Sequence, residues 1–129
     1  MRVVVADTSY IVEGLFNNAS LFDDQIVCTA SYGLYEILNA VWKHQTLLRR
    51  IKDGQPIVDA LFDLIFSGTI QLLTPKVETM KNAYDFAVKT KVPVYDTMFV
   101  ALAKEMRVEL LTFDKKQTAI FNHWRYDLS

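Results

Sequence analysis

The segment from Val92 to Asp114 constrains the fold more than any other stretch, because it combines a helix start, a buried helix and a short strand. Pro93 prevents a helix from running in from the preceding residues, so Asp96 falls in the first turn of a new helix. That helix, predicted over Tyr95–Arg107, is apolar around most of its circumference, which indicates burial on more than one side. A short apolar run follows it and ends just before Asp114, as expected for a parallel strand with a polar residue at its carboxyl end.

Three further apolar runs have the length and composition of strands. Val3–Ala6 is continuously apolar and stops at Asp7, which is typical of a central strand buried on both faces. Ile26–Cys28 is a shorter apolar run, and Ile70–Leu73 is apolar except for Gln71. Helical patterns separate these runs, and strands that alternate with helices predict a mostly parallel central sheet between helical layers. We therefore expect a three-layer α/β/α sandwich.

The helical patterns begin and end at recognisable signals. Thr29 or Ser31 is placed to cap a long helix that extends to about Lys52. Pro56 opens the next helix, and the two helices form a hairpin suited to contact another chain. The segment 77–89 is amphipathic, with one apolar face. That face is formed by Val77, Met80, Tyr84 and Val88.

The C-terminal residues carry two further signals. Asp114 and Gln117 have the spacing of a capping box, which predicts a last short helix. Trp124–Leu128 is predicted to form an edge strand.

Length and composition bound the class of protein. With 129 residues, the chain is expected to form one domain over residues 1–129, which buries a core without disulfides or structural metals. Its single cysteine, Cys28, lies in an apolar run and indicates a reducing compartment. The N-terminal apolar run is too short for a signal peptide or a membrane span. We therefore expect a cytoplasmic protein with no membrane association.

Charge and hydropathy indicate how the protein meets its partners. A formal net charge of −1 excludes a polycation that binds nucleic acid by bulk charge, so any attraction for phosphate is local. Hydrophobic residues make up 51% of the chain and the mean hydropathy is +0.12. Such a composition leaves apolar surface that a partner can cover. We expect a homodimer or a bound protein.

Each acidic residue has a structural explanation when taken alone. Asp7, Asp96 and Asp114 all fall at predicted helix starts, where carboxylates cap or offset the helix dipole, and Glu36 fits a solvated helix face. Taken together they are harder to explain. Asp7 and Asp114 both follow apolar strands, and in a parallel sheet such positions lie at one edge, with Asp96 entering from the same helix–strand unit.

Several carboxylates at one edge need a counter-charge. Two like charges about 4 Å apart repel by about 4 kcal/mol at an effective dielectric constant of about 20. A hard divalent cation offsets this repulsion, and oxygen ligands without cysteine or paired histidine select Mg²⁺ or Mn²⁺. Such a cation binds a phosphodiester and lowers the pKa of an attacking water. The acids therefore predict metal-dependent hydrolysis of a nucleic-acid backbone.

Four motifs resemble those of a known family. VVVADTS at the N-terminus, YEILNAV in the long helix, VYDTMFVALA and LLTFD are similar, in this order, to motifs of the PIN domain nucleases. In particular they resemble the small VapC-like toxin ribonucleases of toxin–antitoxin pairs. The resemblance implies that Asp7, Glu36, Asp96 and Asp114 are the catalytic, metal-binding acids.

The same resemblance assigns supporting residues. It matches Thr112 and the hydroxyls of Thr8 or Ser9 to positions that orient carboxylates or waters. Lysines close in sequence to the acids are candidates to bind RNA phosphates, although lysines on helix surfaces are more often simply solvated. These candidates are Lys43, Lys115 and Lys116. Where some relatives carry a further acid, three residues after Asp114, this chain has Gln117, which weakens the case for a second metal.

The leading hypothesis is a Mg²⁺- or Mn²⁺-dependent endoribonuclease, the toxin of a pair, inhibited by a small antitoxin protein. A housekeeping PIN nuclease in RNA processing is an alternative within the same chemistry. A non-catalytic interaction domain, whose acids only cap helices, is an alternative from another class.

Overall fold

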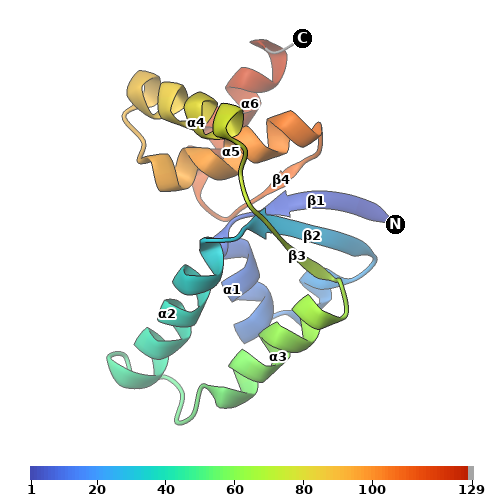
Figure 1. Cartoon of the computed structure of the whole chain (residues 1–129). Helices are drawn as coiled ribbons and strands as arrows, with labels where there is room; N and C mark the ends of the chain where they lie inside the picture. Colours follow the sequence, from blue (N-terminus) through green and yellow to red (C-terminus); the bar gives the residue numbers. More distant parts are fainter. Residues whose placement is uncertain (128–129) are drawn as a thin grey trace.

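The sheet of the computed structural model is fully parallel. The structure describes residues 1–127, with side chains as far as residue 123. The strands are β1 (Arg2–Ala6), β2 (Gln25–Ala30), β3 (Ile70–Leu73) and β4 (Leu110–Leu111), in the order β3-β2-β1-β4 (Figure 1). All three pairings are parallel, which confirms the predicted sheet.

Helices cover both faces of this sheet, as predicted. On one face lie α1 (Thr8–Phe16), α2 (Gly33–Thr46) and α3 (Gln55–Phe66), with a short 3₁₀ turn, η1 (Ala19–Phe22), after α1. On the other face lie α4 (Val77–Thr90), α5 (Val94–Met106) and α6 (Lys115–Asp127), drawn above the sheet in Figure 1. The molecule is therefore the expected three-layer α/β/α sandwich. No helix within residues 1–127 is long and apolar enough to cross a membrane.

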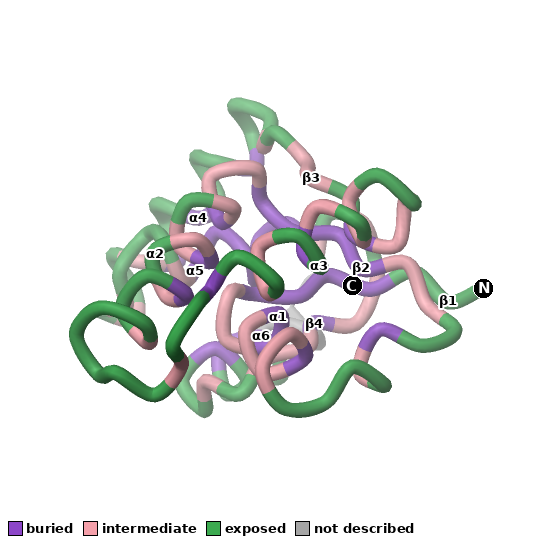
Figure 2. Tube along the Cα trace, turned by 90° about the horizontal axis from the view of Figure 1, so that it is seen from below, coloured by how far each residue is buried: buried purple, intermediate pink, exposed green. Residues whose placement is uncertain are grey.

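The central strand β1 explains why its sequence is continuously apolar. Val5 belongs to the core shared with α4, α5 and α6, whereas Val4 and Ala6 belong to the core shared with α1, α2 and α3. Alternate side chains of a strand point to opposite faces, so both sets are buried. Figure 2 shows the buried trace running through the strands in the middle of the molecule.

Helix α5 is buried along its middle, as its composition predicted. Residues 97–103 are all buried, and the helix contacts α4, α6, β1 and β2. Pro93 is the residue before its first turn, and Asp96 lies within that turn. The helix thereby carries Asp96 to the same region as the strand ends.

Two predicted boundaries are wrong. Helix α2 ends at Thr46 rather than near Lys52, and Gln45 Oε1 accepts a hydrogen bond from Gly54 N at 2.7 Å, which folds the following loop back onto the helix. Thr29 lies within β2, and no side chain caps the start of α2.

The predicted C-terminal edge strand is also wrong. Residues 124–127 continue α6, and Leu128 lies outside the described residues. Once the first turn of α6 has formed, each further residue adds a helical hydrogen bond at little cost, so the helix extends past the predicted boundary.

Helix α4 exposes the apolar face that its sequence pattern identified. Its buried residues are Thr79, Ala83 and Phe86, and α4 packs closely on α5, where Thr97 Oγ1 donates a hydrogen bond to the Ala83 carbonyl. The small side chains of Thr79 and Ala83 permit this close approach of the two helices. The apolar face identified in the sequence is exposed instead, at Val77, Met80, Tyr84 and Val88.

Candidate functional site

Asp7 and Asp114 meet at one edge of the sheet because their strands are neighbours. Strand β1 pairs with β4 in the register Ala6 with Leu111, and Asp7 N donates to the Leu111 carbonyl at 3.2 Å. Each acid follows the carboxyl end of its strand and precedes a helix. The edge therefore lies where ligands bind in open α/β sheets.

The Asp7 carboxylate is held by four hydrogen bonds and is only 2% exposed. Its Oδ1 accepts from Ser9 Oγ at 2.7 Å and from Tyr10 N at 3.1 Å. Its Oδ2 accepts from Thr112 Oγ1 at 2.6 Å and from Gln117 Nε2 at 2.9 Å. An ionised carboxylate has about four acceptor positions, so the surrounding protein satisfies this one fully.

Glu36 reaches the site from α2. Thr8 Oγ1 donates a hydrogen bond to Glu36 Oε2 at 2.9 Å, which ties the start of α1 to α2. Burial raises the pKa of Glu36, the Thr8 hydrogen bond lowers it, and the negative charges of Asp96 and Asp7 raise it further. The net shift is upward, so the protein disfavours the ionised form of this half-buried carboxyl group.

The pKa of Asp96 is raised in the same way as that of Glu36. Burial raises the pKa of Asp96, and the charges of Asp114 and Asp7 raise it further, whereas Lys116 lowers it. The four acids predicted from the sequence therefore sense one another electrostatically, although they come from β1, α2, α5 and the start of α6. An acidic cluster in this condition is where a cation would be stabilised most.

Asp114 caps α6, but the predicted capping box is only half formed. Its Oδ1 accepts from Lys116 N at 2.9 Å, as a cap requires. The amide of Gln117 does not reach back to Asp114 N, which donates to Thr112 Oγ1 at 2.9 Å instead. Gln117 instead donates from Nε2 to the buried Asp7 carboxylate, a charge-assisted hydrogen bond.

Sequence reasoning overlooked Tyr32. Its hydroxyl donates to the Tyr95 carbonyl at 2.6 Å, which joins the start of α2 to the start of α5. Burial raises its pKa, and the charges of Glu36 and Asp96 raise it further. Tyr32 lies four residues before Glu36, so helical spacing was the one signal that placed it near the acids.

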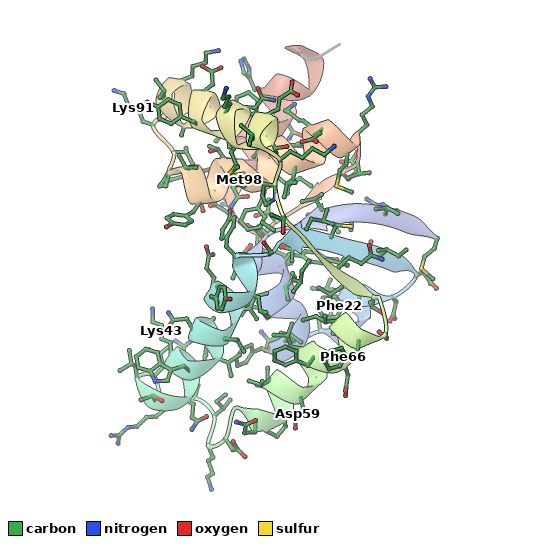
Figure 3. All side chains as sticks on the ribbon, viewed as in Figure 1. Phe22, Lys43, Asp59, Phe66, Lys91 and Met98 are labelled. Carbon is green, nitrogen blue, oxygen red and sulfur yellow. The ribbon has the colours of Figure 1, made fainter. Side chains whose placement is uncertain are left out.

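The three lysines proposed for RNA binding lie at different distances from the cluster. Lys116 is near enough to lower the pKa of Asp96, and Lys115 is an exposed neighbour on the first turn of α6. Lys43 is exposed on α2, seven residues and so about 10 Å along the axis from Glu36. Figure 3 shows it on the outer part of α2, away from the sheet.

The donor set suits a hard divalent cation, although the side chains are not preassembled around one. Within the described residues, no group of three or more His, Cys, Asp or Glu side chains is arranged to hold a metal ion. The available donors are carboxylate oxygens, and Glu36, Asp96 and Asp114 all keep partial exposure to solvent. Oxygen donors of this kind match Mg²⁺ or Mn²⁺ in chemistry and charge.

A parallel sheet of this order with an acidic edge places the chain in a known class. The PIN domain family model matches residues 4–121, so the chain belongs to the PIN domain family, which confirms the resemblance seen in its motifs.

One curated relative and two solved structures are informative. Ribonuclease VapC3 of Pyrobaculum aerophilum is 30% identical over 89 residues, which cover 68% of this chain and 66% of that protein, just under two thirds of its length. PAE2754 from the same organism has a TM-score of 0.73 at 18% identity, over 92% of this chain and 84% of that chain. VapC20 of Mycobacterium tuberculosis, a toxin that cleaves the sarcin–ricin loop, has a TM-score of 0.66 at 16% identity, over 90% and 93%. At these identities the two structures show the shared fold alone.

Proposed function

We propose that the protein is a Mg²⁺- or Mn²⁺-dependent endoribonuclease. The observation that carries this proposal is the electrostatic coupling of Asp7, Glu36, Asp96 and Asp114 at one sheet edge, in a chain of the PIN domain family. The 30% identity to ribonuclease VapC3 supports RNA as the substrate.

The residues have distinct roles in this proposal. Glu36, Asp96 and Asp114 keep solvent access and hold the cation, while Asp7 anchors the cluster through its hydrogen bonds to Ser9 and Thr112. Thr8 orients the Glu36 carboxylate. A divalent cation, when bound, supplies charge neutralisation and an activated water. Lys115 and Lys116 attract the phosphates of the RNA, with a smaller contribution from the more distant Lys43.

The test is cleavage of a pool of RNAs with Mg²⁺ or Mn²⁺, compared with EDTA. Asp96→Asn is the essential control, because contaminating ribonucleases would not respond to it. We expect cleavage that requires the metal and is lost in Asp96→Asn. Activity indifferent to both changes would refute the proposal.

We further propose that the whole chain acts as one nuclease domain in the cytoplasm and is the toxin of a toxin–antitoxin pair. A homodimer and a small antitoxin protein would cover exposed apolar surface, such as the α4 face that includes Met80 and Tyr84. A housekeeping role in RNA processing is the alternative. A neighbouring gene whose small product binds the protein and blocks RNA cleavage would distinguish the toxin.

A non-catalytic interaction domain is the second candidate function. Its support is that Asp7 and Asp114 cap helices, by accepting from Tyr10 N and Lys116 N. This candidate predicts that no divalent cation binds at the acidic edge. Binding of Mn²⁺ that disappears in Asp96→Asn would exclude it, because Asp96 accepts no capping hydrogen bond from the described residues.

A further inference from the structure

Gln117 is buried beside the acidic cluster. It lies on the first turn of α6, is 3% exposed, and donates a hydrogen bond from Nε2 to Asp7 Oδ2. The orientation of its amide is fixed by charge, because the opposite orientation would place the amide oxygen against the Asp7 carboxylate. The nitrogen therefore faces Asp7, and the oxygen faces away from it.

That oxygen has no partner. Gln117 Oε1 is buried and accepts no hydrogen bond from any residue that the structure describes. Buried amide oxygens are almost always satisfied, so an orphan in a native protein indicates a water or an ion. Gln117 itself belongs to the acidic cluster, because it bonds to Asp7 and lies on the turn of α6 that Asp114 caps.

We propose that Gln117 is a positioning residue of the cation site, an inference that rests on the proposed metal-dependent function. Its Nε2 orients the Asp7 carboxylate, and its Oε1 supplies a neutral oxygen to the divalent cation. A neutral oxygen in place of a further carboxylate leaves the cluster with four negative charges rather than five. The chain is thereby adapted to hold one cation rather than two.

Binding of Mn²⁺ tests this role without any measurement of activity. The signal of free aqueous Mn²⁺ in electron paramagnetic resonance gives both the dissociation constant and the number of bound ions. The variants are Gln117→Met, which keeps the volume but removes both polar atoms, and Gln117→Glu, which adds a carboxylate. Gln71→Glu adds the same charge at an exposed position on β3 and serves as the matched control.

We expect Gln117→Met to weaken Mn²⁺ binding by about 10-fold or more, the usual effect of removing a group that supports metal ligands. Gln117→Glu is expected to bind Mn²⁺ more tightly, by about 10-fold, and to admit a second ion, while Gln71→Glu matches the wild type. Melting curves without metal establish that each variant folds. If Gln117→Met does not fold, Gln117→Glu decides alone, and unchanged or weaker binding by it overturns the inference.

The opposite result for Gln117→Met has a clear meaning. Mn²⁺ binding as tight as in the wild type, or tighter, would show that the amide only occupies an oxygen of Asp7 and does not support the cation. The proposed role of Gln117 would then be wrong. Failure of the wild-type protein to bind Mn²⁺ is a different outcome, because it would refute the proposed function itself.

Discussion

Asp7 and the pair formed by Glu36 and Asp96 are carboxylates of one cluster in opposite circumstances. Asp7 is buried and receives four hydrogen bonds. Glu36 receives one, from Thr8, and the described residues donate none to the Asp96 side chain. The pKa of both members of the pair is raised, first by burial and then by neighbouring acids. The fold thus offsets the burial of Asp7 fully with hydrogen bonds, but it does not offset the burial and mutual repulsion of Glu36 and Asp96. Such a pattern is typical of sites where stability is lost in favour of function.

The largest effect is expected on RNA cleavage when the pair loses a charge. Glu36→Gln and Asp96→Asn are each expected to lower the cleavage rate on the order of 100- to 1000-fold, because each removes charge that holds the cation. Single-turnover assays with a fluorescent RNA measure this rate. Asp59→Asn, on the exposed face of α3 (Figure 3), is the control. An active Asp96→Asn protein would place the chemistry elsewhere.

Asp7 is expected to differ from the pair in its effect on folding. Asp7→Asn leaves Thr112 and Gln117 with donors that face an amide group, so the free energy of unfolding is expected to fall by about 2 kcal/mol. Urea unfolding without metal measures this loss. A variant as stable as the wild type would mean that the hydrogen bonds of Thr112 and Gln117 to Asp7 do not stabilise the fold.

Neutralising Glu36 and Asp96 is expected to stabilise the folded protein at neutral pH, whereas neutralising Asp7 destabilises it. Because the folded-state pKa of Glu36 and of Asp96 is raised, folding favours their neutral forms. This contribution to stability is complete below the unfolded-state pKa values, which are about 4, and is lost as the pH rises through the folded-state values. The double variant Glu36→Gln/Asp96→Asn stays neutral and keeps the contribution.

Melting temperatures without metal test this pH dependence. The double variant is expected to match the wild type near pH 3.5 and to melt on the order of 2–5 °C higher at about pH 7. A matched exposed substitution, Asp59→Asn, is expected to show no such divergence. A double variant that is less stable than the wild type at neutral pH would contradict the claim that the ionised forms of Glu36 and Asp96 destabilise the folded protein.

The smallest effect is expected at the lysines. Lys115→Ala and Lys116→Ala are each expected to weaken RNA binding only a few-fold, and to lower the salt dependence of log Kd by about 0.7 for each phosphate that the variant no longer neutralises. Filter binding over a range of salt, in the Asp96→Asn background, measures both quantities. Lys81→Ala, exposed on α4, provides the baseline. If Lys81→Ala and Lys116→Ala weakened RNA binding equally, the proposed local phosphate-binding site at Lys115 and Lys116 would be wrong.

Local rules predicted the elements of the fold that depend on short-range signals. The apolar run before Asp7, the Pro93 signal before Asp96 and the strand that ends before Asp114 were all readable, so the sheet and its acidic edge followed. The boundaries of α2 and α6 did not follow, because a loop contact from Gln45 and the propagation of a capped helix decide them. The exposed face of α4 depends on packing against α5, which no local pattern encodes.

Within the site, the sequence identified the acids but not their circumstances. Asp7 and Asp96 both occur at helix starts, and nothing local separates the carboxylate that accepts four hydrogen bonds from the one that accepts none from the described residues. That difference arises from Thr112 and Gln117, which lie 105 and 110 residues from Asp7 along the chain. Contacts of such separation are set by tertiary structure, so the hydrogen bond from Gln117 to Asp7 emerged only in the folded protein.

The effect of Mn²⁺ on the melting temperature tests most directly the claim that Glu36 and Asp96 form part of a cation-binding site. The wild-type protein is expected to be stabilised by about 2.7 kcal/mol, or several degrees, at a Mn²⁺ concentration 100 times Kd. The double variant Glu36→Gln/Asp96→Asn is expected to show no shift. A wild-type protein that Mn²⁺ does not stabilise, or a double variant that it stabilises equally, would contradict the claim.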